Sequence, residues 1–235
     1  MMKKRLFVVI LLFLSVYFVQ AQKIGFVAGY TASYNYVDIP DYDIDFNQSL
    51  GSGYHFGGML EWNFTPRWGL DLSLLYEIRN SRYNLSYKSD TTTRLNRTLQ
   101  YLDLPVHFFM DFKVGKIVLS PYLGGALCVG LAGKDKAWMD VPTERPVLFL
   151  DSDMYDKDDG HVNRWDLKGE AGLAAKYKRW QFRATYSMSL VDTSNDEFKW
   201  TLDVLRAADK SFYQGEAKFS ICYLFDLKPD YTRKR

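Results

Sequence analysis

The feature that most constrains the fold of this 235-residue chain is an alternation of apolar and polar residues. From Trp165 to Tyr177 every second residue is apolar or glycine, and the pattern resumes from Trp180 to Leu190. Successive side chains of a β-strand point to opposite faces, so a period of two predicts strands with two unlike faces. The stretch therefore indicates a β-hairpin, and it raises the question of which face meets water.

Similar alternation predicts eight strands along the chain. They lie at 23–36, 53–64, 68–79, 101–112, 116–133, 165–177, 180–190 and 211–225. Three connections are tight (65–67, 113–116 and 178–179), whereas four are long and polar (near 37–52, 80–98, 133–163 and 191–210). Short turns at one end and long loops at the other predict an all-β fold, an eight-stranded antiparallel transmembrane up-and-down β-barrel of OmpA/OmpX-like architecture.

The width of such a barrel decides which face points inward. Eight strands enclose an interior that is only just filled by side chains. The apolar faces carry about five large residues per strand, on the order of 40 in all, which such a lumen cannot hold. The opposite faces carry Gly, Ser, Thr, Ala and charges of both signs, which fit. We therefore predict that the apolar faces point outward, and a surface of that size requires lipid as its solvent.

The rival interpretation is a soluble, lipocalin-like cup with an apolar interior and a charged exterior. It predicts Lys and Glu at every polar position of the strands, whereas glycine stands at several of them, including Gly25, Gly29 and Gly57. The glycines favour the membrane barrel.

The first residues resemble a secretory signal. Lys3, Lys4 and Arg5 precede an apolar run at 6–19, and Val19-Gln20-Ala21 supplies a small-x-small cleavage pattern. The run is shorter than the roughly 20 residues of a spanning helix. We expect a cleaved signal peptide at 1–21, a barrel at 22–225, a periplasmic polar tail at 226–235, and localisation in the outer membrane of a Gram-negative cell.

Composition adds three constraints. Without residues 1–21, 27 basic residues face 28 acidic ones, so no charge excess indicates nucleic-acid binding. The aromatic share of 17% suits strands and interfacial girdles. Cys128 and Cys222 are expected at different heights of the barrel, which favours two separate buried thiols over the alternative of a disulfide.

These features together resemble the eight-stranded outer-membrane β-barrel family of Bacteroidota, often labelled the PorT-like or porin-family barrel group. The resemblance rests on the signal ending VQAQ, the YLDLPVHF strand, the PYLGGALCVGL stretch and the final aromatic strand. It covers almost all of the mature chain and implies a barrel, not an activity. The chain departs from many barrels in following Phe225 with the polar segment DLKPDYTRKR.

Charged residues of both signs gather on the predicted inward faces. The predicted lumen charge network consists of Glu61, Asp71, Glu77, Arg79, Asp103, His107, Asp111, Asp166, Lys168, Glu170, Lys176, Arg183, Glu216 and Lys218. One interpretation is a charged gate or narrow ion path. We favour a satisfied network that fills the lumen, because buried charges are retained when they are paired and hydrogen-bonded.

His107 stands between Asp103 and Asp111 on one predicted face, which suggests a proton relay. Strand residues four apart are separated by roughly 13 Å, however, beyond direct contact. We therefore expect an ordinary lumen histidine unless adjacent strands supply partners, and the same holds for His55.

Acidic residues crowd the predicted loops, and the third loop contains DSDMYDKDDGH. Carboxylates in flexible loops can bind calcium, which makes this loop a weak metal-site candidate. Its candidate ligands are Asp151, Asp153, Asp156 and Asp158. The spacing does not match an EF-hand loop, so any metal stays unassigned.

These observations favour a non-catalytic outer-membrane barrel with a structural or surface-interaction role through long extracellular loops. The alternatives are a small porin-like channel through the charged lumen and an accessory of an outer-membrane secretion system. A rim enzyme using His161 has no nucleophile motif to support it. We predict no cofactor. The expected partners are outer-membrane lipid and a protein or surface ligand at the loops, not nucleic acid.

Overall fold

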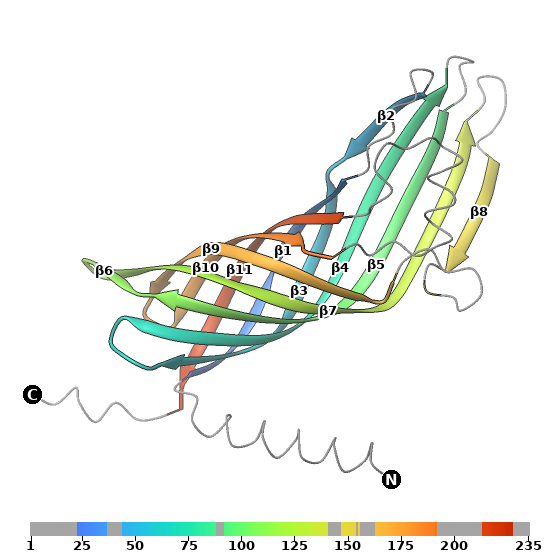
Figure 1. The fold of residues 1–235 in the computed structure, drawn as a ribbon. Coiled ribbons are helices and arrows are strands. Elements are labelled where there is room, and N and C mark those ends of the chain that lie inside the picture. The colour runs from blue at the N-terminus through green and yellow to red at the C-terminus, as the bar shows by residue number, and fades with distance from the viewer. Residues whose placement is uncertain are drawn as a thin grey trace, which may run out of the picture.

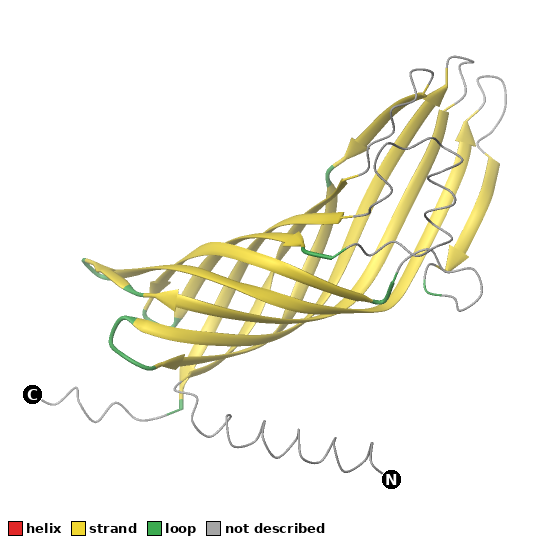
Figure 2. Ribbon diagram, in the orientation of Figure 1, coloured by secondary structure: helices red, strands yellow, loops and turns green. Residues whose placement is uncertain are grey.

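A computed structural model describes residues 23–36, 44–87, 92–140, 147–153, 155, 163–191 and 213–227. These residues form one antiparallel sheet of eleven strands (Figures 1 and 2). The strands are β1 (Lys23–Tyr36), β2 (Ile44–Ser49), β3 (Gly51–Asn63), β4 (Trp68–Tyr87), β5 (Thr92–Met110), β6 (Phe112–Val114), β7 (Ile117–Asp140), β8 (Val147–Asp153), β9 (Trp165–Tyr177), β10 (Trp180–Ser189) and β11 (Tyr213–Asp226). In this part of the chain, no helix is long and apolar enough to cross a membrane.

Eight of these strands close into a ring, which confirms the predicted barrel. Each strand pairs antiparallel with the next in the order β1, β3, β4, β5, β7, β9, β10, β11, and β11 pairs with β1 from Lys23↔Asp226 to Tyr36↔Tyr213. Closure leaves the ring without a free edge, which is what a sheet surrounded by lipid requires. The three further strands β2, β6 and β8 each add to one strand of the ring.

One end of the barrel, here named the turn end, collects the short connections. The turns at 64–67, 115–116 and 178–179 lie there, together with the start of β1 and the end of β11. Gly115 and Lys178 have φ values of 62° and 55°, the left-handed conformation that tight turns of this kind require. The three tight connections predicted from the sequence are therefore in place.

The burial pattern confirms that the barrel is apolar outside. Along β10 the side chains alternate strictly between exposed and buried, with Phe182 53% exposed and Arg183 7% exposed. Phe108, Leu123 and Phe219 are likewise exposed on other strands. A cup with an apolar interior would have reversed this pattern, so the lipocalin-like alternative is wrong.

Aromatic rings mark the turn-end border of the outer apolar surface. Trp68 stacks on Phe108, and Trp180 and Phe225 both pack edge-on against Tyr223. Rings with a polar handle favour the membrane–water interface. From Trp68 to Ile78 the outward face of β4 is apolar over roughly 33 Å of strand, which at a tilt of about 40° matches the roughly 25 Å apolar band of outer-membrane barrels.

At the opposite end the structure corrects the sequence analysis. The segments at 80–98 and 133–163 were expected to be long polar loops, yet β4 runs to Tyr87, β5 starts at Thr92 and β7 runs to Asp140. With β2 and β8 these ends form a sheet, here named the extension, that continues past the ring (Figure 1). The sequence analysis did not detect these strands, because hydrophobicity does not alternate along a strand whose two faces are both polar.

A β-bulge lies where the extension leaves the ring. Tyr101 pairs with Gly130 but Gln100 pairs with Ala132, so Leu131 is an extra residue on β7. A bulge bends a strand and increases its local twist. The residues that face outward below the bulge are apolar, including Leu102 and Leu127, whereas those above it are mostly polar, including Asn96 and Lys134.

The outward face should tolerate charge only above the apolar band. We expect Val106→Arg, in the middle of the outward face of β5, to destabilise the folded barrel by about 2–4 kcal/mol, because lipid cannot solvate the guanidinium there. Asn96→Arg, on the same face of the extension, should cost about 1 kcal/mol or less. Equilibrium unfolding by urea in lipid vesicles measures both, and equal costs would contradict the assignment of the faces.

Candidate functional site

The lumen is the largest cluster of charged side chains in the described structure. Thirteen of the fourteen residues of the predicted network are at most 8% exposed, and the side chain of Asp111 is 16% exposed. They come from six strands and from the junction after β5, and alternation points them inward. Three groups can be distinguished along the barrel axis, here named the central, middle and turn-end clusters.

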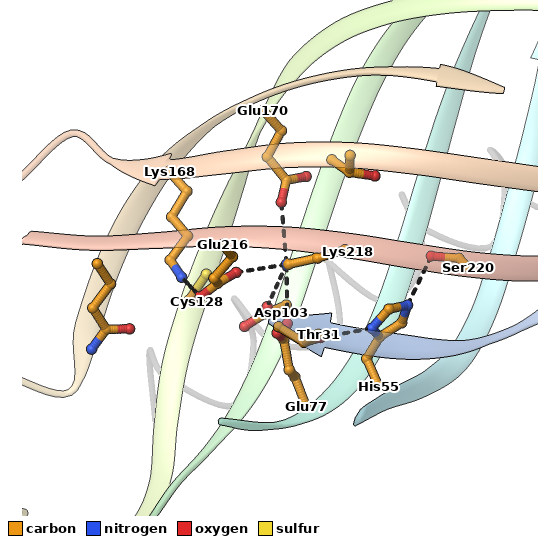
Figure 3. A network of polar contacts seen from close by, with 12 residues as sticks. Thr31, His55, Glu77, Asp103, Cys128, Lys168, Glu170, Glu216, Lys218 and Ser220 are labelled. Atoms are coloured by element: carbon orange, nitrogen blue, oxygen red, sulfur yellow. Dashed lines mark hydrogen bonds and ion pairs between the residues drawn. The ribbon is translucent and has the colours of Figure 1, made fainter. Parts of the chain in front are cut away.

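Lys218 organises the central cluster (Figure 3). Its Nζ lies 3.0 Å from Glu77, 3.4 Å from Asp103, 3.3 Å from Glu170 and 3.2 Å from Glu216. These carboxylates belong to β4, β5, β9 and β11. One ammonium group therefore connects four strands around the ring.

Two more cations complete this cluster. The Arg79 guanidinium lies 2.7 Å from both Asp103 and Glu216 and 3.3 Å from Glu77, and its plane covers the Tyr101 ring at 4.0 Å. Lys168 forms ion pairs with Glu216 and, at 3.7 Å, with Asp166. Cations and anions alternate in this cluster, so each buried charge has partners of opposite sign.

His107 is the centre of the middle cluster, with partners that the chain's linear spacing did not indicate. Its Nδ1 lies 2.8 Å from Asp71 and its Nε2 lies 2.7 Å from Glu170. Its partners are therefore not Asp103 and Asp111, the carboxylates of its own strand face, but residues of other strands, with Asp71 on the adjacent strand β4. Arg183 joins the group, 3.2 Å from Asp71.

A missing side chain makes the contact between His107 and Glu170 possible. In the register of β7, Gly124 lies directly between these two residues. A Cβ at Gly124 would collide with the carbonyl oxygen of Val106. Glycine here leaves the imidazole a path across β7 to the carboxylate of β9.

His55 also reaches a partner across a glycine of the intervening strand. Its Nδ1 lies 2.9 Å from Thr31 Oγ1 and its Nε2 lies 2.8 Å from Ser220 Oγ (Figure 3). Gly29 stands between His55 and Ser220 in the register, and a Cβ there would collide with the imidazole. Hydroxyl partners give this histidine no carboxylate to stabilise a charge, unlike His107.

The turn-end cluster closes the lumen on that side. Glu61 pairs with Lys23 at 2.7 Å and with Lys176 at 3.1 Å, and Lys176 also pairs with Asp111 at 3.1 Å. The ammonium of Lys176 lies 3.8 Å above the Phe109 ring. Lys23 also belongs to the network, although the sequence analysis did not include it: it is the first residue of the predicted strand at 23–36 and its partner Glu61 lies on the neighbouring strand.

Little space remains between these groups. A cavity of about 20 Å³ lies between the layers of His55 and His107, with Thr185, Lys218 and Ser220 also in its lining. A cavity of this size holds about one water molecule. The lumen is thus filled by paired side chains along the clusters.

At the other end, a loop residue inserts into the mouth. Tyr155 is 5% exposed, packs edge-on against Tyr101 and fills the space above Gly130. Arg164 donates a hydrogen bond to its carbonyl oxygen at 2.9 Å. Burial raises the pKa of the Tyr155 phenol, so it stays neutral. The sequence analysis missed this residue because nothing in an acidic loop distinguishes one tyrosine.

The described structure covers only part of the candidate metal site of the third loop. Asp151 and Asp153 lie on β8, and the carboxylate of Asp153 accepts a hydrogen bond from the Tyr155 amide at 3.0 Å. Asp156, Asp158 and His161 lie outside the described residues. Within those residues, no group of three His, Cys, Asp or Glu side chains is arranged to hold a metal ion. Cys128 and Cys222 are free thiols, buried in separate clusters.

Comparison with known proteins places the chain in a family. Residues 19–195 match the family described as outer membrane protein beta-barrel domain. The chain belongs to this family, and its barrel is an outer-membrane barrel. No curated protein matches the sequence.

Several solved structures are similar in outline. Ail, the attachment invasion locus protein of Yersinia pestis, is 14% identical, with 87% of this chain and 99% of that chain covered and a TM-score of 0.42. The structure of Ail in complex with the heparin analogue sucrose octasulfate is also 14% identical, with 86% of this chain and 98% of that chain covered and a TM-score of 0.40. Neisserial surface protein A (NspA) is 13% identical, with coverages of 86% and 97% and a TM-score of 0.39.

Removing Lys218 should destabilise the whole ring, because four carboxylates lose a shared cation. We expect Lys218→Met to lower the free energy of unfolding by about 3–5 kcal/mol, the usual effect of leaving a buried charge without its partner. Lys113→Met, at the exposed turn end, is the matched control and should change it by less than about 0.5 kcal/mol. Unfolding by urea in vesicles provides the measurement, and similar small effects for both variants would show that the network is dispensable.

Proposed function

We propose that this protein is a non-catalytic surface-interaction barrel, which holds the extension and its loops at the outer surface of the outer membrane. The observation that carries the proposal is the contrast between the two parts of the structure. The lumen is filled by ion pairs, whereas β4, β5 and β7 continue past the apolar band as a polar sheet. An ordered sheet outside the membrane, together with a filled lumen, supports binding of a ligand or partner at the surface over transport of solutes through the barrel.

The arrangement of ends supports the same orientation. The first strand, β1, begins at the turn end and the last strand, β11, ends there. The short turns at 64–67, 115–116 and 178–179 lie at the same end. In outer-membrane barrels the short turns are periplasmic and the long connections extracellular. By this rule the extension faces the outside of the cell and the tail at 226–235 lies in the periplasm. The small-x-small pattern at Val19-Gln20-Ala21 supports removal of a signal peptide at 1–21 on export.

Within its family, we infer that the chain falls with the PorT-like barrels of Bacteroidota. The YLDLPVHF strand, with an acidic residue and a proline on its inward face, and the aromatic last strand support this narrower placement. A role as an accessory of a secretion system would be compatible with it, and the secreted proteins of a deletion strain test that role.

The orientation can be tested in intact cells with a membrane-impermeant maleimide. Asn96→Cys, on the extension, should be labelled in intact cells, whereas Lys116→Cys, in a turn, should be labelled only after the outer membrane is permeabilised. Both side chains are exposed, and the native thiols of Cys128 and Cys222 are buried, so background labelling should be low. Labelling of Lys116→Cys alone in intact cells would reverse the orientation and refute the proposal.

Conductance separates the proposal from a porin-like channel. We expect the purified protein to give essentially no current steps in planar bilayers, because the central cluster blocks the lumen. The double variant Lys168→Ala/Glu216→Ala removes the ion pair between these two residues and the contacts of Glu216 with Arg79 and Lys218, so it should leak more than the wild type. Steady ohmic steps from the wild type would instead favour the channel.

A further inference from the structure

A groove on the outward face of the extension lies just above the apolar band. It has a volume of about 350 Å³ and is formed by β5 and β7. Its lining consists of Asn96, Thr98, Gln100, Ala132, Gly133, Lys134, Lys136 and Trp138. None of these residues belongs to the lumen network.

The position of the groove is set by the alternation of β5. Tyr101 and Leu99 point inward and are at most 2% exposed, so Gln100 and Thr98 face outward with Leu102 and Leu104. Leu102 and Leu104 are 37% and 40% exposed in the lipid-facing surface. The polar groove thus begins one outward residue above leucines that contact acyl chains, and on β7 it begins directly after Leu131.

The chemistry of the lining is that of a site for an anionic sugar. It offers amide groups, a hydroxyl, two lysines and an indole, and its eight residues include no carboxylate. Amides and hydroxyls form hydrogen bonds with sugar hydroxyls, ammonium groups pair with phosphate or carboxylate, and a tryptophan offers a flat apolar face. In the register of β7 with β8, Asp153 lies opposite Lys134 and Asp151 lies opposite Lys136, and the carboxylate of Asp153 also accepts the Tyr155 amide.

The inner wall of the groove is pre-organised. Thr98 Oγ1 donates to Asn80 Oδ1 at 2.9 Å, and the Tyr76 hydroxyl donates to Gln100 Oε1 at 2.9 Å. These bonds run from β4 to β5 and fix two of the side chains that line the groove. A site whose polar groups are held in place loses less entropy when it binds a ligand.

We propose that this groove binds the phosphorylated sugar headgroup of an outer-leaflet glycolipid, whose acyl chains lie on Leu102, Leu104 and Leu131 below. An amphipathic ligand matches a surface that changes from apolar to polar and basic within one residue. The inference rests on the proposed function, because the extension must face the outer leaflet. Binding of lipid in micelles tests the groove itself, whereas maleimide labelling tests only the orientation, so the two can fail separately.

The test measures binding of lipid A carrying one acidic core sugar to the full chain in neutral detergent micelles, by native mass spectrometry. Lys134→Gln/Lys136→Gln should weaken binding by about tenfold or more, since charge-assisted hydrogen bonds are lost. Trp138→Ala should also weaken it. The matched control Lys113→Gln/Lys116→Gln removes two exposed lysines at the turn end and should change binding less than about twofold. Circular dichroism checks that each variant is folded.

Three results would overturn the proposal. Equal losses in the two double variants would indicate general attraction of an anion to a cationic surface. Binding of the groove variants within twofold of the wild type would place the lipid elsewhere. Binding of the same phosphorylated saccharide without acyl chains as tightly as the intact lipid would identify a free glycan as the ligand. The proposal expects the acylated form to bind at least about tenfold more tightly, because its chains bury apolar surface.

Discussion

Ion pairing in a tube too narrow for water is the interaction on which this barrel depends. Eight strands leave an interior of side-chain width, and the chain fills it with charges that alternate in sign around Lys218, Arg79 and His107. Each of these side chains bridges strands that are distant in sequence. The network therefore connects strands that are not neighbours in the ring, whereas backbone hydrogen bonds connect only neighbouring strands.

This choice of interior determines the exterior. Because charges, glycines and hydroxyls occupy most of the lumen, with a few apolar side chains such as Leu75 and Phe109 packed among them, most large apolar residues point outward, where only lipid can solvate them. The same alternation, continued past the bulge at Leu131, presents polar residues outward on the extension. A single continuous strand such as β5 thus supplies lumen packing, lipid contact and a polar surface above the membrane.

The sequence predicted the ring because alternation in hydrophobicity is a local signal. The hairpin at 165–190, the three tight turns and the inward placement of Lys168 and Glu170 could all be read from single strands. Contacts across the ring could not, because register and closure decide them. His107 illustrates this, since its partners come from β4 and β9 and are reached only across Gly124.

The extension and the groove escaped prediction for a related reason. Strands at 80–87, 92–100 and 132–140 have polar residues on both faces, so they carry no alternation, and only pairing reveals them. Tyr155 was equally invisible, because its place in the barrel mouth depends on the space above Gly130. In this protein, sequence patterning encodes the membrane-embedded ring, whereas the candidate recognition surface is encoded by long-range pairing.

The most direct test of this account compares two adjacent leucines of β4. Leu74 is 52% exposed on the outward face and Leu75 is 6% exposed on the inward face. With the barrel in lipid nanodiscs, NMR should detect nuclear Overhauser effects between lipid acyl chains and the methyl groups of Leu74, and none to those of Leu75. Acyl-chain contacts at Leu75 and not at Leu74 would mean that the sheet is turned the other way, and the filled charged lumen would be wrong.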